Sequence, residues 1–177
     1  MCEVTEGRDV TCDTAGGSKK AYIYSLVDSL GVSNYSTPPT IVDGVVTAMT
    51  LKPTKFAYAI NVQAETIEAT VNSIGEAANS AAAHEHSVII TLAGNTAEDI
   101  KAATQIVKGR VGVILELNDG TFELFHFQEG FGGKVQRARA TGKLLDDMNG
   151  SVWTITSRQP LPEVKIPSTI VNALLQP

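Results

Sequence analysis

One short segment of the sequence groups residue types that coordinate metals. His84 and His86 flank Glu85 and lie two residues apart, so on a β-strand both imidazoles share one face. Two imidazoles on one face hold a divalent metal when a third ligand approaches them. No spacing elsewhere marks that third ligand, and two solvated imidazoles at an exposed strand end explain the pattern more simply. The sequence therefore predicts no metal and no cofactor, and a small metal-binding module is kept only as a lesser alternative.

The other candidates for catalysis are equally isolated. His126 stands between Phe125 and Phe127 without a serine or cysteine nucleophile motif, which favours a histidine satisfied within a sheet. The glycine-rich segment 130–133 lacks the Lys-Ser/Thr ending and the following helix of a phosphate loop, and favours a bulge or turn. Paired carboxylates can perform acid–base chemistry, but spacing does not bring the acids on the predicted strands together. These acids are Glu65, Glu68, Glu116 and Glu123. The sequence predicts a protein that is not an enzyme.

The charge distribution limits the possible partners. The 177 residues carry a net charge of −5, which argues against a protein that holds nucleic acid by its phosphates. A protein that lets DNA pass without sequence-specific binding stays compatible with that charge. Lys134, Arg137, Arg139 and Lys143 form the only basic run, and no interleaved aromatics offer stacking platforms. We interpret Lys134, Arg137 and Arg139 as a surface that meets acidic strands of another subunit.

Composition and cysteine usage indicate the setting. A chain that is 43% hydrophobic is able to build one core, and no linker divides it. No apolar run is long enough to span a bilayer and no signal peptide is evident, so we expect no membrane partner. Cys2 and Cys12 then suit free thiols in a reducing cytoplasm.

The hydrophobic patterns predict a mainly β (α+β) fold, a sandwich or barrel of some eight strands with one flanking helix near 97–108. Thr96 and Asp99 resemble a capping box, and Gly109 suits the position after the helix end. Ile100, Ala103 and Val107 would form the packing face of that helix. The remaining predicted elements are a strand at 21–27, a loop at 28–40, a hairpin about 43–44, a long hairpin within 55–92, a hairpin 111–117/121–127 and a strand pair 135–144/151–157. The Ala-rich segment 75–83 is expected to be either the tip of the long hairpin or a short helical turn. Polar or Pro-rich segments at 1–20 and 160–177 are predicted to be arms, the second ending in a small docking helix or strand.

The order of these segments resembles a known family. The start MCEVTEGRDVTCDTAGGSKKAYIYSL is similar to the start of virion structural proteins of tailed bacteriophages, particularly those infecting Bacteroidetes. The long hairpin, the helix, VGVILELNDGTFELFHF and ATGKLLDDMNGSVWTITSRQP follow in the order of the tail-tube family. The resemblance covers most of the chain.

The resemblance implies a single tail-tube-like domain over 1–177 that forms hexameric rings with an inner β-barrel built from all subunits. Stacked rings would make a tube in the virion tail, assembled in the host cytoplasm with other tail proteins, through which DNA slides along an electronegative lumen. We expect the hairpin segment 61–73 to line that lumen through Glu65 and Glu68, with Lys134, Arg137 and Arg139 at a subunit interface. A head–tail connector, head-completion or capsid-decoration protein of the same virion is the alternative.

Overall fold

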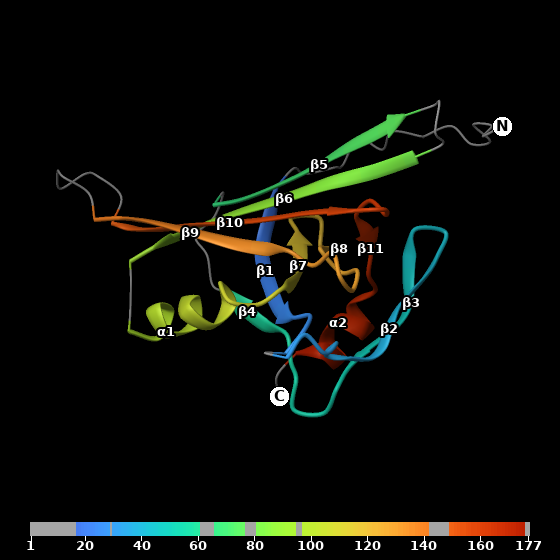
Figure 1. Ribbon diagram of the computed structural model, residues 1–177, viewed down its shortest axis with the longest axis horizontal. Coiled ribbons are helices and arrows are strands. Elements are labelled where there is room, and N and C mark those ends of the chain that lie inside the picture. The colour runs from blue at the N-terminus through green and yellow to red at the C-terminus, as the bar shows by residue number, and fades with distance from the viewer. Residues whose placement is uncertain are drawn as a thin grey trace.

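The computed structural model describes residues 17–28, 30–60, 66–76, 81–94, 97–141 and 149–175. Within them the chain is mainly β, with two sheets and no closed barrel, so the predicted fold class is confirmed at that level (Figure 1). The first sheet contains, in spatial order, β2 (Tyr35–Val42), β3 (Val45–Leu51), β11 (Val164–Lys165), β8 (Phe122–Phe125), β7 (Val111–Leu117), β1 (Ser18–Ser25) and β4 (Tyr58–Ile60). The second contains β5 (Ile67–Glu76), β6 (Ala81–Ala93), β10 (Gly150–Gln159) and β9 (Lys134–Ala140). The two helices are α1 (Ala97–Ile106) and α2 (Ser168–Leu174).

The four-stranded sheet is antiparallel and built from long strands. β5 and β6 form a regular hairpin from the pair Ile67↔Ile90 to the pair Glu76↔Ala81. β10 pairs with β6 along its whole length and with β9 on its other side. Figure 1 shows the β5–β6 end and the β9–β10 end of this sheet reaching past opposite sides of the body beneath it.

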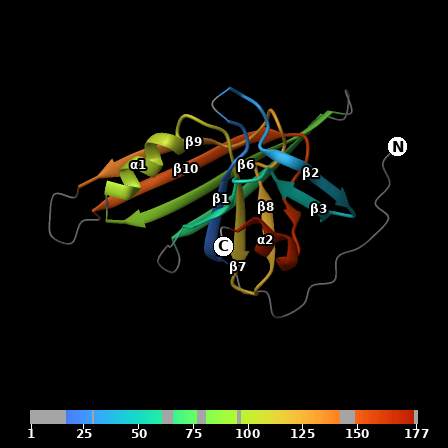
Figure 2. The same ribbon diagram turned by 90° about the horizontal axis from the view of Figure 1, so that it is seen from below.

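β1 and β7 form the middle layer of the molecule, because both of their faces are buried. The runs 21–24 and 111–115 are buried at every position, as expected for strands covered on two sides. One face of these strands packs against the four-stranded sheet, where Ile23 and Val113 meet Ile90 and Trp153 in one apolar cluster. The other face forms a second cluster that β2, β3 and α2 close (Figure 2).

The two predicted turns fold the chain back as expected. Asp43 and Gly44 both adopt positive φ, 51° and 76°, as the two central residues of a type I′ hairpin require. They join β2 to β3. β7 and β8 pair across the segment 118–120, where Gly120 has a φ of 85°.

The prediction of a loop over 28–40 is wrong from Tyr35 onward, because β2 runs through Pro38 and Pro39. β2 is an edge strand whose register with β3 shifts between Thr37 and Thr40. A proline lacks the N–H that a central strand needs, but it is tolerated on an edge with irregular pairing.

The predicted helix is confirmed at 97–106, two residues shorter than expected. Its packing face differs from the prediction, because Ala103 is buried and Ile106 packs against the core, whereas Ile100 and Val107 are 48% and 46% exposed. Thr96 lies outside the described residues, and Gly109 does not adopt a positive φ.

The described ends of the chain pack on its own fold, and the C-terminal segment ends in a small helix, as predicted. Ser18 to Lys20 belong to β1, and residues 1–16, with both cysteines, lie outside the described part. β11 inserts between β3 and β8, and α2 buries Val171 and Leu174 against the chain's own core. The predicted pair 135–144/151–157 is confirmed as β9 and β10, with 142–148 outside the description. Neither described helix has the length and apolar character needed to cross a bilayer.

Candidate functional site

The four-stranded sheet has one face packed on the core and one open face. In the middle of the sheet the residues facing the core are large and apolar, as in the cross-strand neighbours Trp153 and Ile90. Residues of the opposite face alternate with them and are mostly small or polar. The described open-face positions are Glu68, Thr70, Asn72 and Ile74 of β5; Ala83, Glu85, Ser87, Ile89, Thr91 and Ala93 of β6; Val152, Thr154, Thr156 and Arg158 of β10; and Lys134, Gln136, Ala138 and Ala140 of β9.

Both outer strands of this sheet are unpaired on one side within the described residues. β5 pairs with β6 alone and β9 pairs with β10 alone. The sequence of β5 carries two acids and no cation, and the sequence of β9 carries three cations and no acid. The sheet therefore has an acidic edge and a basic edge on opposite sides.

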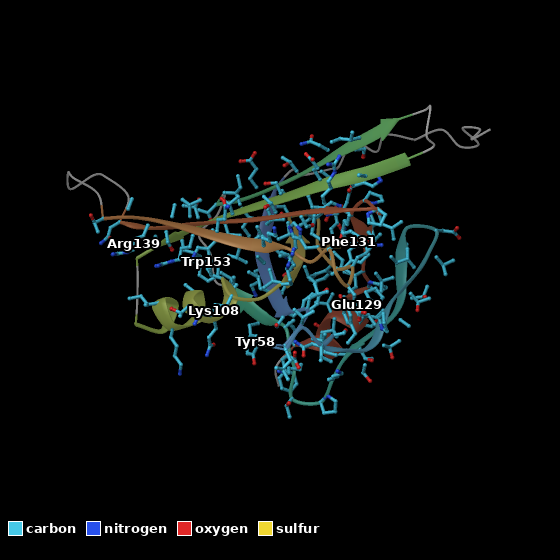
Figure 3. All side chains as sticks on the ribbon, viewed as in Figure 1. Tyr58, Lys108, Glu129, Phe131, Arg139 and Trp153 are labelled. Atoms are coloured by element: carbon cyan, nitrogen blue, oxygen red, sulfur yellow. The ribbon has the colours of Figure 1, made fainter. Side chains whose placement is uncertain are left out.

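The predicted site residues are divided between the two faces and edges. Glu68 is exposed on the open face of β5, and Glu65 lies outside the described residues. Lys134 is exposed on the open face of β9, whereas Arg137 and Arg139 point to the other side. Figure 3 shows Arg139 and Trp153 on the side of the sheet where α1 lies. The three predicted interface residues thus share one edge strand but not one face.

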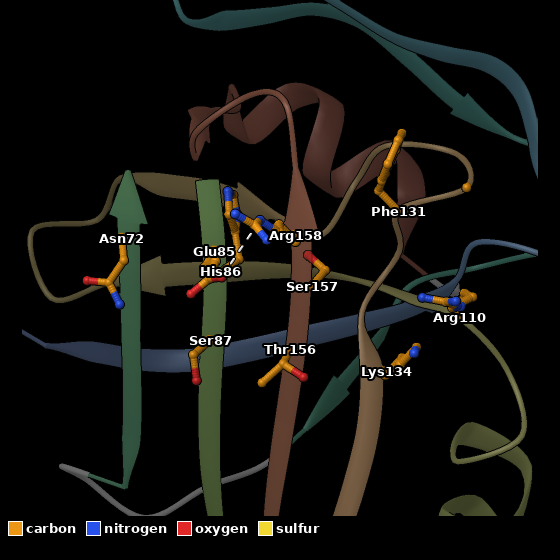
Figure 4. A pocket seen from close by; sticks show the side chains of 11 residues that line it. Asn72, Glu85, His86, Ser87, Arg110, Phe131, Lys134, Thr156, Ser157 and Arg158 are labelled. Atoms are coloured by element: carbon orange, nitrogen blue, oxygen red, sulfur yellow. Dashed lines mark ion pairs between the residues drawn. The ribbon is translucent and has the colours of Figure 1, made fainter. Parts of the chain in front are cut away.

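A groove of about 520 Å³ crosses the open face and continues to the loop that precedes β9 (Figure 4). Three cations contribute to its wall, Arg110, Lys134 and Arg158, together with the aromatic ring of Phe131. Glu85 is the one carboxylate among the lining residues, with its Oε1 3.7 Å from the Nε of Arg158. The remaining lining residues are Asn72, His86, Ser87, Gly130, Thr156 and Ser157.

His86 does not form a solvated pair with His84, so that part of the prediction is wrong. His86 is only 1% exposed and its ring centroid lies 5.7 Å from that of His126. Its Nε2 is 3.1 Å from the carbonyl oxygen of Leu161, and the Nε2 of Gln159 lies 3.2 Å from the same ring nitrogen. His84 instead shares a hydrogen bond of 2.8 Å with Ser73. The described residues contain no group of three metal-ligating side chains.

His126 has a serine partner that sequence spacing did not indicate. Its Nδ1 lies 2.7 Å from Oγ of Ser157, 31 positions away, and its Nε2 is buried without a hydrogen-bond partner. Burial, with a smaller contribution from His86, lowers the pKa of His126 to about 3. An imidazole with that pKa is a weak base near neutral pH, and none of the described side chains bonds to its other nitrogen, so within the described residues the pair lacks the arrangement that activates a serine.

The acids on the predicted strands separate into two environments. Glu116 forms an ion pair with Lys19 at 2.8 Å and accepts a hydrogen bond from Tyr22 at 3.0 Å. Burial, and to a lesser extent this hydrogen bond, raises the pKa of Tyr22 to about 12. Glu123 and Glu163 line a second groove, to which the edge strand β5 contributes residues that include Glu68. Burial chiefly, and the charge of Glu163, raise the pKa of Glu123.

Comparison with known proteins identifies no relative for this arrangement. No protein-family model matches the chain, and no match is found among curated proteins or solved structures.

Proposed function

We propose that this chain is a structural subunit that joins copies of itself edge to edge into a closed ring, and that such rings stack into the tail tube of a tailed bacteriophage. The observation that carries the proposal is a sheet with an acidic free edge, a basic free edge and an open polar face. The segment order described above favours the tail tube among ring-forming proteins.

The free edges supply the means of assembly. An unpaired strand presents a row of backbone N–H and C=O groups that bind another strand readily. β5 offers ten residues and β9 seven, and both strands are regular enough to pair fully with their inner neighbours. Pairing β9 of one copy with β5 of the next would satisfy both edges and extend the sheet around a ring.

The charges of the two edges favour this head-to-tail pairing over self-pairing. Two β9 edges would bring Lys134, Arg137 and Arg139 against the same cations of another copy, and like charges across strands are destabilising. A β9–β5 contact instead places Lys134 on the same face as Glu68, while Arg137 and Arg139 meet no cation of β5. Unlike surfaces that join head to tail generate rings when the rotation closes.

The open face would become the inner wall of such a ring. Its small and polar side chains are suited to contact with water rather than to packing. The charged side chains that the structure describes on this face are the acids Glu68 and Glu85 and the cations Lys134 and Arg158. The electronegative lumen expected from the family would therefore depend on Glu65 and Glu76, whose side chains are outside the described ones.

Charge exchange between the edges tests the proposal. One variant carries Lys134→Glu and Arg139→Glu on β9, and a second carries Glu68→Lys and Glu76→Lys on β5. Each variant alone should lose rings in electron micrographs and sediment as smaller species, because its two edges then have the same sign. An equimolar mixture should recover rings of alternating subunits. Lys108→Glu, an exposed cation beyond the end of α1, is the matched control and should assemble normally.

Wild-type protein that stays monomeric at high concentration would contradict the proposal, and so would edge variants that assemble like the control. Micrographs also separate the related candidates of the same virion. Stacked tubes support a tail tube, whereas isolated rings indicate a connector or head-completion protein, and binding to a capsid lattice indicates a decoration protein.

A further inference from the structure

We propose that the groove on the open face binds the phosphate backbone of a nucleic acid strand without reading its sequence. The groove is the one lined by Arg110, Lys134, Arg158 and Phe131 (Figure 4). This inference deepens the proposed function, because the groove lies on the face that would form the inner wall of the ring.

The groove has a local excess of positive charge. Arg110 precedes β7, Lys134 begins β9 and Arg158 lies near the end of β10, so three separate segments bring one cation each to the groove. Glu85 alone opposes them, and its pair with Arg158 joins side chains that are 48% and 61% exposed at a separation of 3.7 Å. An exposed ion pair of this kind contributes little, so Arg158 stays free to exchange Glu85 for a phosphate. The groove thus has a net positive charge in a chain whose net charge is −5.

Arg110, one of these three cations, is held in place by the backbone. Arg110 donates a hydrogen bond of 3.0 Å from Nη1 to the backbone oxygen of Gly132, in the loop that carries Phe131. Figure 4 shows Arg110 and Lys134 at the same side of the groove, with Phe131 beyond them. A guanidinium fixed by one hydrogen bond still has four N–H donors for phosphate oxygens.

The neutral lining suits the same ligand. Asn72, Ser87 and Thr156 present amide and hydroxyl groups along the floor, and such groups commonly donate to phosphate oxygens in nucleic-acid complexes. Phe131 is 48% exposed at the rim, where its ring would stack on an unpaired base. Contacts to phosphate oxygens carry no sequence information directly, so the contact would be independent of sequence.

Binding to short labelled oligonucleotides by fluorescence anisotropy tests the inference, with single-stranded and duplex forms measured between about 50 and about 200 mM salt. Three phosphate contacts per subunit predict an affinity loss of about 20-fold for the single strand and about 40-fold for the duplex across that range. The variant with Lys134→Gln and Arg158→Gln keeps one contact and should lose only about three- to fourfold. Phe131→Ala should weaken binding of the single strand by at least about fivefold and leave the duplex unchanged.

The matched control carries Lys101→Gln and Lys108→Gln, which removes two exposed cations from the region of α1 instead of the groove. Equal salt dependence in the groove variant and this control would overturn the inference, as would the absence of binding at the lower salt concentration. Assembly is recorded in the same samples. Rings that do not bind oligonucleotides would overturn this inference and leave the proposed function intact. Binding by a chain that never assembles would overturn the proposed function and leave nucleic-acid binding by the groove intact.

Discussion

The imidazole of His126 and the hydroxyl of Ser157 share a hydrogen bond of 2.7 Å that joins the two sheets of the molecule. His126 follows the last residue of β8, whereas Ser157 belongs to β10 in the opposite sheet. The backbone of His126 is left-handed, with a φ of 56°, which turns the chain out of β8 at this point. Where β8 ends, this hydrogen bond takes the place of apolar contacts in holding the two sheets together.

This contact predicts that the protein loses stability in mild acid. Burial lowers the pKa of His126 from its ordinary value of 6.5 to about 3, and burial also lowers the pKa of His86. Between pH 6.5 and 3 the unfolded chain therefore binds a proton at position 126 that the folded chain does not. Stability from this group is intact above pH 6.5 and falls as the pH decreases, by about 2 kcal/mol at pH 5.

Urea unfolding at pH 7.5 and pH 5 measures this loss. His126→Asn is the informative variant, because asparagine tolerates a left-handed backbone and has no proton to gain in this range. The difference in unfolding free energy between the two pH values should shrink by about 2 kcal/mol in the variant. An unchanged difference would show that His126 is not kept neutral by the fold.

The sequence patterns predicted the local elements better than their assembly. Asp43-Gly44 and the alternation around 111–127 specified two hairpins, since turn chemistry and period are local properties. The strand over Pro38 and Pro39 was missed because prolines usually end strands, and only the edge position of β2 allows them. Likewise, α1 packs through Ala103 and Ile106, because the contact depends on where the sheet lies and not on the helix period alone.

The candidate site depends on contacts between distant segments. Lys134 follows Arg110 by 24 positions, and Arg158 follows Lys134 by another 24, so no local motif joins the three cations. Only the order of strands brings them to one groove. The contact between the rings of His86 and His126 likewise joins distant segments, so the sequence does not predict it. The sequences of β9 and β5 do carry opposite charges, and the strand order places these two strands at opposite edges of one sheet.

The buried pair formed by Tyr24 of β1 and Tyr35 of β2 provides a prediction about stability. Tyr35 donates from its hydroxyl to the backbone oxygen of Phe127 at 2.7 Å, and the hydroxyl of Tyr24 lies 2.7 Å from the hydroxyl of Tyr35. Tyr35→Phe would leave two buried polar atoms without this partner, at a cost of about 1–3 kcal/mol in unfolding free energy. Tyr58→Phe removes a hydroxyl from a side chain that is 53% exposed and should change stability little in the same assay.

The C-terminal helix is predicted to be part of the core rather than a removable arm. Leu174 is 3% exposed and packs in the cluster that α2 closes. Leu174→Ala should cost about 2–5 kcal/mol, measured by thermal or urea unfolding. Asn172→Ala, at an exposed position of the same helix, should be near neutral or slightly stabilising because alanine favours helix formation. Equal effects of the two substitutions would mean that α2 does not pack on the fold in solution.

Gly112 is predicted to be required for the packing of Tyr24. The two residues are directly opposite each other on β7 and β1, and a Cβ at position 112 would overlap the tyrosine ring. Because Tyr24 is buried and its hydroxyl is bonded to Tyr35, the ring has little room to move. Gly112→Ala should therefore destabilise the protein by about 1–3 kcal/mol, as overpacking of a core does.

A matched glycine and a second substitution separate this overlap from a general effect of replacing glycine. At Gly109 a Cβ would meet only the backbone oxygen of Ile106 at 3.9 Å, and its φ is not positive, so Gly109→Ala should be neutral or slightly stabilising. In a chain that already carries Tyr24→Leu, which removes the ring and its hydroxyl, Gly112→Ala should cost much less than in the wild type. A double-mutant cycle of unfolding free energies measures that coupling. Additive effects would place the cost of Gly112→Ala in the strand backbone instead of in the contact with Tyr24.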